Sequence, residues 1–154
     1  WSHDSLSKTN FRARLRQYAR DSKDGSGFAF FIFRKEDDQL IGSVTLSNIR
    51  RGVAQTGTIG YWTGEPYARQ GYMFESLCGL APNLFEQYGL RRIEAACVPE
   101  NEASASLLEK VGFKPEGRAR EYLCINGMWR DHLLFALLNT DPVGGGSSGV
   151  SKIA

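Results

Sequence analysis

Hydrophobic and polar residues follow two different periods along the chain, and each change of period predicts a new element. Residues 7–21 place Phe11, Leu15 and Tyr18 on one face of a helix, with cations at most of the other positions. The next segments are short and rich in β-branched or aromatic residues. They predict a meander of three strands at residues 28–35, 40–50 and 56–63.

Helical spacing returns at residues 72–88, where Pro82 interrupts the pattern and predicts a kink. Residues 91–98 form a short, nearly continuous apolar run that is typical of a strand buried in a sheet. Asn101 is a good N-cap residue, and it predicts a helix over residues 102–111.

Two further strands are predicted at residues 117–125 and 128–138, joined by Asn126-Gly127, a strong signal for a two-residue hairpin turn. The element order therefore predicts an α+β fold with a mixed, mostly antiparallel sheet flanked by helices. With 154 residues, we expect a single domain over residues 1–138, followed by a flexible Gly/Ser-rich tail over residues 139–154.

The overall charge favours no particular class of partner, because 19 basic and 17 acidic residues leave a net charge of +2. Direct nucleic-acid binding is therefore not expected from composition. The first helix concentrates five cations, which we interpret as a solvated face, with an RNA-binding surface as the alternative. These cations are Lys8, Arg12, Arg14, Arg16 and Arg20.

The chain has three widely spaced cysteines, Cys78, Cys97 and Cys124, and each lies in an apolar pattern. We expect three buried, reduced thiols in a cytoplasmic protein. No zinc site is expected, because the only histidines are His3 and His132 and no CxxC pair is present. No apolar run is long enough to cross a membrane, so no membrane partner is expected.

A tight turn precedes the second long helix in the stretch "GEPYARQGYMFESL", residues 64–77. Helix N-termini present unpaired N–H groups that suit an anion. Gly71 would let ligand oxygens approach the backbone closely, and Arg69 supplies a cation suited to phosphate. The residues alone leave two alternatives open: an ordinary strand-to-helix turn, or a cradle for a phosphate-bearing ligand.

The ordered motifs of the chain resemble those of the GCN5-related N-acetyltransferase (GNAT) superfamily. The phosphate loop of that family falls on Ala68–Met73, where only its first glycine is matched, by Gly71. The stretches "IGYW", "NEAS" and "EYLCINGMWRDHLLFAL" further resemble the branch of ribosomal-protein-alanine N-acetyltransferases. The chain begins at Trp1, and the first strand and helix of the family have no counterpart, so we expect an N-terminally incomplete domain.

The resemblance implies that acetyl-CoA is the co-substrate and that no metal is needed. Its pantetheine arm would lie along the third strand, where that strand splays from the strand at residues 92–98. Its pyrophosphate would take backbone N–H groups at the start of the second long helix. The implied cofactor-binding residues are Gly60, Tyr61, Trp62, Thr63, Arg69, Gln70, Gly71, Tyr72, Met73, Phe74, Asn101 and Ser104.

Acetyl transfer to an amine needs a neutral amine, a stabilised oxyanion and a protonated leaving thiolate. Many family members use a helix tyrosine as the acid, but Leu108 occupies that place here. The resemblance instead implies Ser104 as the acid. Glu121 is the expected base and Tyr122 its alternative, while Glu94 is interpreted as a surface or ion-paired carboxylate, with a water relay as the alternative.

The resemblance implies that the acceptor is the α-amine of a protein N-terminus. The acceptor protein would start with a small residue and could be a ribosomal protein. Two alternatives stay open within the same fold. One is an acetyltransferase for small amines such as an aminoglycoside or a polyamine. The other is a non-catalytic module that binds acetyl-CoA or RNA. A homodimer is compatible with each of them.

Overall fold

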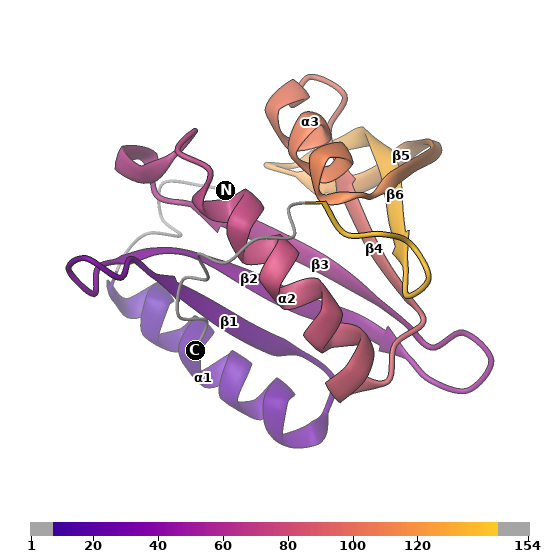
Figure 1. Cartoon of the computed structure of the whole chain (residues 1–154). Helices are drawn as coiled ribbons and strands as arrows, with labels where there is room; N and C mark the ends of the chain where they lie inside the picture. The colour runs from indigo at the N-terminus through magenta and orange to yellow at the C-terminus, as the bar shows by residue number, and fades with distance from the viewer. Residues whose placement is uncertain (1–7, 145–154) are drawn as a thin grey trace.

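The computed structural model describes residues 8–144, and its central feature is a six-stranded sheet flanked by helices (Figure 1). The predicted α+β class with a mixed sheet is confirmed. In chain order the elements are α1 (Lys8–Asp24), β1 (Phe28–Phe33), β2 (Leu40–Arg50), β3 (Thr56–Thr63), the 3₁₀ turn η2 (Glu65–Tyr67), α2 (Tyr72–Tyr88), β4 (Arg92–Cys97), α3 (Glu102–Val111), β5 (Lys114–Ile125) and β6 (Met128–Leu138).

The strand order is β1-β2-β3-β4-β6-β5, and neighbouring strands are antiparallel except for the pair β3 and β4. The parallel pair needs a long crossover, which the turn η2 and helix α2 supply. The last two strands form the predicted hairpin, in which Asn126 and Gly127 have φ values of 51° and 76°. Two successive positive φ angles are those of the tight turn that the Asn-Gly pair predicts.

Alternate residues of β1 contact helices on opposite faces of the sheet. Phe28 and Phe30 pack against Tyr88 of α2, with ring centroids 4.6 and 6.1 Å apart. Phe31 points the other way and meets Tyr18 of α1 at 6.4 Å. Since side chains alternate along a strand, α1 and α2 cover opposite faces, as their positions around β1 in Figure 1 also show.

The main core lies between α2 and the sheet. Buried residues of α2 recur every three or four positions, so one face of the helix is apolar. They pack on side chains from both halves of the sheet, including Val44, Ile59 and Ile93. Helix α2 therefore holds β3 and β4 in place although the two strands share only a short ladder. Its buried residues are Met73, Ser76, Leu77, Leu80, Ala81 and Leu84.

Helix α1 buries much less of its surface than α2 does, and each of its residues 9–24 is at least partly exposed. Phe11 and Leu15 stay 38% and 37% exposed. The side chain of Arg20 bonds to Gln17 on the helix surface, and the cation Arg12 is exposed. The arrangement is that of a solvated helix face.

Three details differ from the sequence-based expectations. Cys124 is exposed, whereas Cys97 is buried and Cys78 half-buried. The expectation of three buried thiols was wrong for Cys124, because this residue lies on the edge strand β5, close to the hairpin turn. Strand β5 begins at Lys114, earlier than predicted. Residues 139–144 of the predicted tail make backbone hydrogen bonds to the domain, such as Gly144 N–H to the Val111 carbonyl, and the rest of the tail lies outside the described residues.

Candidate active site

A cleft opens where β3 and β4 separate. The two strands pair only from Thr56 opposite Arg92 to Thr58 opposite Glu94. Beyond these residues β3 continues along β2 and β4 continues along β6, so the sheet splits into two arms. The resulting cleft has a volume of about 1380 Å³ and is walled by both arms, by the starts of α2 and α3, and by the hairpin. This is the splay that the family resemblance implies.

The N-terminus of α2 forms one end of the cleft. Gly71 is its N-cap residue, with φ 82° and ψ 0°, and it provides no side-chain cap. Glu75 is the first residue of the helix whose N–H bonds to a backbone acceptor, which is the Gly71 carbonyl. The N–H groups of Tyr72, Met73 and Phe74 are therefore free to bind an anion in the cleft.

The space in front of Gly71 is open as well. A Cβ built on this glycine meets no atom within 4 Å. Arg69, which is exposed, also lines this end of the cleft. Unpaired N–H groups, an open approach and a nearby guanidinium fit a diphosphate, so the residues present fit the group that the sequence predicts here.

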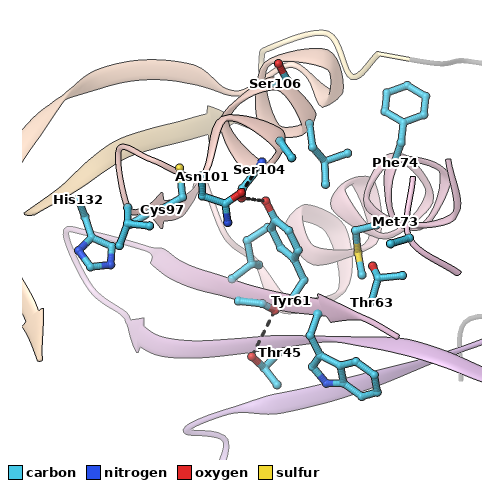
Figure 2. A pocket seen from close by; sticks show the side chains of 18 of the residues that line it. Thr45, Tyr61, Thr63, Met73, Phe74, Cys97, Asn101, Ser104, Ser106 and His132 are labelled. Carbon is cyan, nitrogen blue, oxygen red and sulfur yellow. Dashed lines mark hydrogen bonds between the residues drawn. The ribbon is translucent and has the colours of Figure 1, made fainter. Parts of the chain in front are cut away.

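The start of α3 forms the opposite wall. Asn101 caps this helix as predicted, because its side-chain oxygen accepts the Ser104 N–H at 3.1 Å. Ser104 is held from the other side by Tyr61 of β3, whose phenol oxygen lies 2.6 Å from the serine Oγ (Figure 2). One hydroxyl is thus fixed by two elements that are distant in sequence. Leu108, one turn further along α3, is fully buried and does not face the cleft.

Burial sets the protonation of the groups around Ser104. It raises the pKa of the Tyr61 phenol, and the hydrogen bond to Ser104 offsets only part of that rise. Burial also raises the pKa of the Cys97 thiol, with a smaller opposing effect from Ser104. Both groups therefore carry their protons at neutral pH, which makes this end of the cleft a source of protons and not of anions.

The β5–β6 hairpin closes one side of the cleft. Tyr122 and Leu123 of β5 and His132 of β6 line it. His132 is only 3% exposed, and its Nδ1 lies 3.0 Å from the Arg130 carbonyl, so a protonated Nδ1 donates to that oxygen. The rings of Tyr122 and His132 have centroids 5.7 Å apart. The structure shows no partner for the His132 Nε2 among the described residues.

Most of the predicted site residues meet at this cleft. The lining includes every predicted cofactor residue except Gln70, whose side chain bonds to the Pro66 carbonyl instead. Of the predicted catalytic residues, Ser104 and Tyr122 line the cleft. Glu121 does not, because β5 has an irregularity in its register there, with Glu121 at φ 45° and exposed.

Glu94 lies outside the cleft as well. Its carboxylate pairs with Arg92 at 2.9 Å and with Arg50 at 3.6 Å, which is the ion-paired arrangement expected for it. It lies at the base of the splay, where it joins β4 to β2. A role for Glu94 in a water relay finds no support in this position.

Sequence reasoning missed two groups, His132 and the side chain of Tyr61. His132 entered only as an argument against zinc, although its place in the alternating strand "RDHLLFAL" could have marked it as inward-facing. Tyr61 was predicted as a cofactor-binding residue, but its side chain was given no role in the chemistry. Its contact with Ser104 spans 43 positions in the sequence, so no local pattern reveals it.

Two further properties concern the described part of the chain. No group of three or more His, Cys, Asp or Glu side chains among residues 8–144 is arranged to hold a metal ion. Over the same range, each helix is too short or too polar to cross a membrane.

Comparison with known proteins identifies the fold. The family Acetyltransferase (GNAT) domain matches residues 1–114. The probable N-acetyltransferase YjcK of Bacillus subtilis is 40% identical over 130 residues, covering 84% of this chain and 72% of that protein. The [ribosomal protein uS5]-alanine N-acetyltransferase of Escherichia coli is 36% identical over 133 residues, covering 86% and 69%.

A solved structure agrees with these relatives. The structure of Mycobacterium smegmatis RimJ in complex with CoA-disulfide superposes with a TM-score of 0.81 and 30% identity, covering 87% of this chain and 63% of that one. The cradle at Gly71 and the splayed strands fit acetyl-CoA, as expected from the sequence. The chain belongs to the GNAT acetyltransferases and is an acetyl-CoA-dependent N-acetyltransferase.

Proposed function

We propose that the chain acetylates the α-amine of a protein N-terminus that begins with a small residue, and that this acceptor is a ribosomal protein. Similarity to the uS5-alanine acetyltransferase of Escherichia coli supports the acceptor class. We also infer a cytoplasmic location, because ribosomal proteins are made there.

The observation that carries the proposal is the charge of the cleft. Its lining contains no Asp or Glu among the described residues, whereas it does contain Arg69 and Lys110. A polyamine or an aminoglycoside carries several ammonium groups and needs carboxylates to bind them. A peptide end brings a single amine, so it fits a cleft of this composition better than a small polycation does.

The chemistry agrees with an α-amine. A terminal α-amine has a pKa near 7.7–8.0 and is partly neutral at physiological pH, whereas a lysine amine, near 10.4, is almost fully charged. A site with a modest base therefore favours the α-amine. Holding this amine against the thioester supplies much of the remaining acceleration.

Four side chains receive roles in this proposal. Ser104 donates the proton to the leaving sulfur, and Asn101 holds the start of α3 in place. On the side of the cleft that the hairpin closes, His132 accepts the proton of the amine through Nε2, with Tyr122 beside it. Glu121 is the alternative base, although its place on the irregular part of β5 does not favour it.

A competition assay tests the acceptor. One peptide begins with Ala or Ser, and a matched peptide has a blocked N-terminus and one internal lysine. With acetyl-CoA present, we expect mass spectrometry to find the acetyl group on the free N-terminus, at a rate at least tenfold above that of the lysine peptide. Faster acetylation of the lysine peptide, or of an aminoglycoside added to the same mixture, would exclude the proposed acceptor.

Two controls address the non-catalytic alternatives. Absence of acetylation of every acceptor, combined with intact binding of acetyl-CoA, would identify a binding module. A salt-dependent titration with RNA tests the cations of α1 separately. We expect only weak binding in that titration, because these side chains lie on a helix that does not border the cleft.

A further inference from the structure

The hydroxyl of Ser104 faces a difficulty as a proton donor. An isolated serine that gives up its proton becomes an alkoxide, which is a far stronger base than the departing thiolate. A donor next to the serine would remove this difficulty by replacing the proton as it leaves. The structure places one such donor, the Tyr61 phenol, 2.6 Å from the serine Oγ.

We propose that Tyr61 supplies the proton that Ser104 passes to the sulfur of acetyl-CoA, so that the two hydroxyls act as one relay. The inference rests on the proposed role of Ser104, but it does not depend on which amine is the acceptor. Tyr61 acts through Ser104 and is therefore a positioning and proton-supplying residue. Both side chains line the cleft, and Figure 2 shows their hydroxyls meeting between β3 and α3.

The relay requires one orientation of this hydrogen bond, in which the phenol donates and the Ser104 Oγ accepts. Tyr61 is partly buried among the core residues and keeps its proton, because burial raises its pKa. A phenol that donates to the serine Oγ leaves the serine hydrogen free to point elsewhere. Ser104 lines the cleft, so in this orientation its hydrogen can point to the sulfur of acetyl-CoA there or to the neighbouring Cys97 thiol.

The proton balance closes without an added reactant. The bond between the acetyl carbon and sulfur breaks, and the sulfur takes the Ser104 hydrogen while Ser104 takes the Tyr61 hydrogen. The negative charge ends on a phenolate and not on a serine alkoxide, and a phenol, with an ordinary pKa near 10 that burial raises here, is a better final donor than an aliphatic hydroxyl. The proton that His132 takes from the acceptor amine on amide formation then returns to the phenol through solvent.

Cys97 is the second titratable group beside Ser104, so it is the competing proton source. Its thiol is buried on β4 and lines the same end of the cleft. The geometry favours Tyr61, because a short O···O hydrogen bond already joins it to the serine, and thiols are weak donors. Parallel variants of the two residues separate the alternatives.

The test compares Tyr61→Phe, Ser104→Ala and the double variant, with Tyr88→Phe as a matched control. Tyr88 packs against β1 and does not line the cleft. For Tyr61→Phe we expect kcat to fall by about 10- to 100-fold, at or below the lower end of general acid–base effects, while calorimetry shows acetyl-CoA binding within about twofold. The double variant should be no slower than Ser104→Ala, because residues in one relay are not additive.

A second substrate distinguishes proton supply from a structural role. The selenoester analogue of acetyl-CoA has a leaving group that departs without a proton. The ratio of the parental kcat to that of Tyr61→Phe should therefore be smaller with the selenoester than with the thioester. A defect of equal size with both esters, multiplicative effects in the double variant, or a larger loss in Cys97→Ala than in Tyr61→Phe would each overturn the relay. If Ser104→Ala turns over normally, the acid role itself fails; if it is slow while Tyr61→Phe is normal, only the relay fails.

Discussion

Gly71 shows most directly how one residue prepares the site. Its φ of 82° is strained for most side chains, so glycine is the residue that suits this position. A serine or aspartate cap would occupy the N–H groups of the first turn with its own oxygen. Glycine leaves these groups to the ligand, at the expense of a cap that would stabilise the unliganded helix.

Gly71→Glu should therefore block the cradle with both bulk and negative charge. We expect its affinity for acetyl-CoA to fall by more than tenfold, which corresponds to about 1.4 kcal/mol. Gly71→Ala is the matched control, since it carries the same strain at φ 82° without the charge, and a Cβ there touches nothing within 4 Å. Calorimetry on the folded variants measures both, and equal affinities for the glutamate variant and the parent would contradict the cradle.

At the scale of elements, the register of the β5–β6 hairpin decides which of its side chains line the cleft. The register shifts between Ala119 and Leu123, and Glu121 takes a positive φ at this irregularity. The Glu121 N–H bonds to the Asp131 side chain, which stabilises the irregular backbone. Its neighbour Tyr122 points to the cleft, so the shift determines that the aromatic residue and not the carboxylate lines the wall.

The same irregularity yields a prediction about the base. His132→Asn keeps a donor near the position of Nδ1 for the Arg130 carbonyl but removes the acceptor Nε2. We expect kcat to fall by about 10²-fold in this variant and to change little in Glu121→Gln, because of these two residues only His132 lines the cleft. Steady-state assays at saturating acetyl-CoA compare the two. The opposite ranking would restore Glu121 as the base and place the hairpin in a different conformation during turnover.

The elements themselves were largely predictable, because each has a local signal. The Asn126-Gly127 turn, the Asn101 cap and the apolar period of α2 all follow from residues within a few positions of one another. The irregular register at Glu121 was not predicted, since it depends on Asp131 of the partner strand. The exposure of Cys124 was not predicted for a similar reason, because its apolar neighbours in the sequence do not reveal that β5 is an edge strand.

At the scale of the whole molecule, the cleft exists because two halves of the sheet meet over three residue pairs only. The half made of β1, β2 and β3 carries one wall of the cleft, and the half made of β4, β6 and β5 carries another. This division was predictable only through the resemblance to a known family. The contact of Tyr61 with Ser104 was beyond both routes, because it requires the two halves to be placed in space.

Ion pairs and hydrogen bonds of carboxylates stabilise the half of the sheet made of β4, β6 and β5. Arg92 of β4 reaches across β6 and donates to Glu116 of β5, and this guanidinium lowers the pKa of the Glu116 carboxyl. The pKa of Asp131 is lowered mainly by the hydrogen bond from the Glu121 N–H and next by that from Arg118. The pKa of Asp141 is lowered mainly by the N–H of Leu138, with a smaller effect of Lys114.

These shifts predict that acid weakens the second half of the sheet. A carboxyl whose pKa is lowered on folding contributes stability above its unfolded value, here 4.5 for Glu116, and loses it as the pH falls through the folded value. Glu116→Gln should therefore reduce the free energy of unfolding at pH 7 by less than about 1 kcal/mol, because the pair is partly exposed, and the difference from the parent should shrink as the pH falls below 4.5.

Urea unfolding at pH 7, 5, 4 and 3 measures this difference, and Glu109→Gln is the matched control. Glu109 is exposed on α3 and has no ion pair among the described residues, so its variant should differ from the parent by a small amount that is the same at each pH. High salt should shrink the effect at Glu116, because screening weakens exposed pairs most. A difference at Glu116 that grows as the pH falls would contradict the sign of the pKa shift, and with it the stabilising contact between Arg92 and the edge strand.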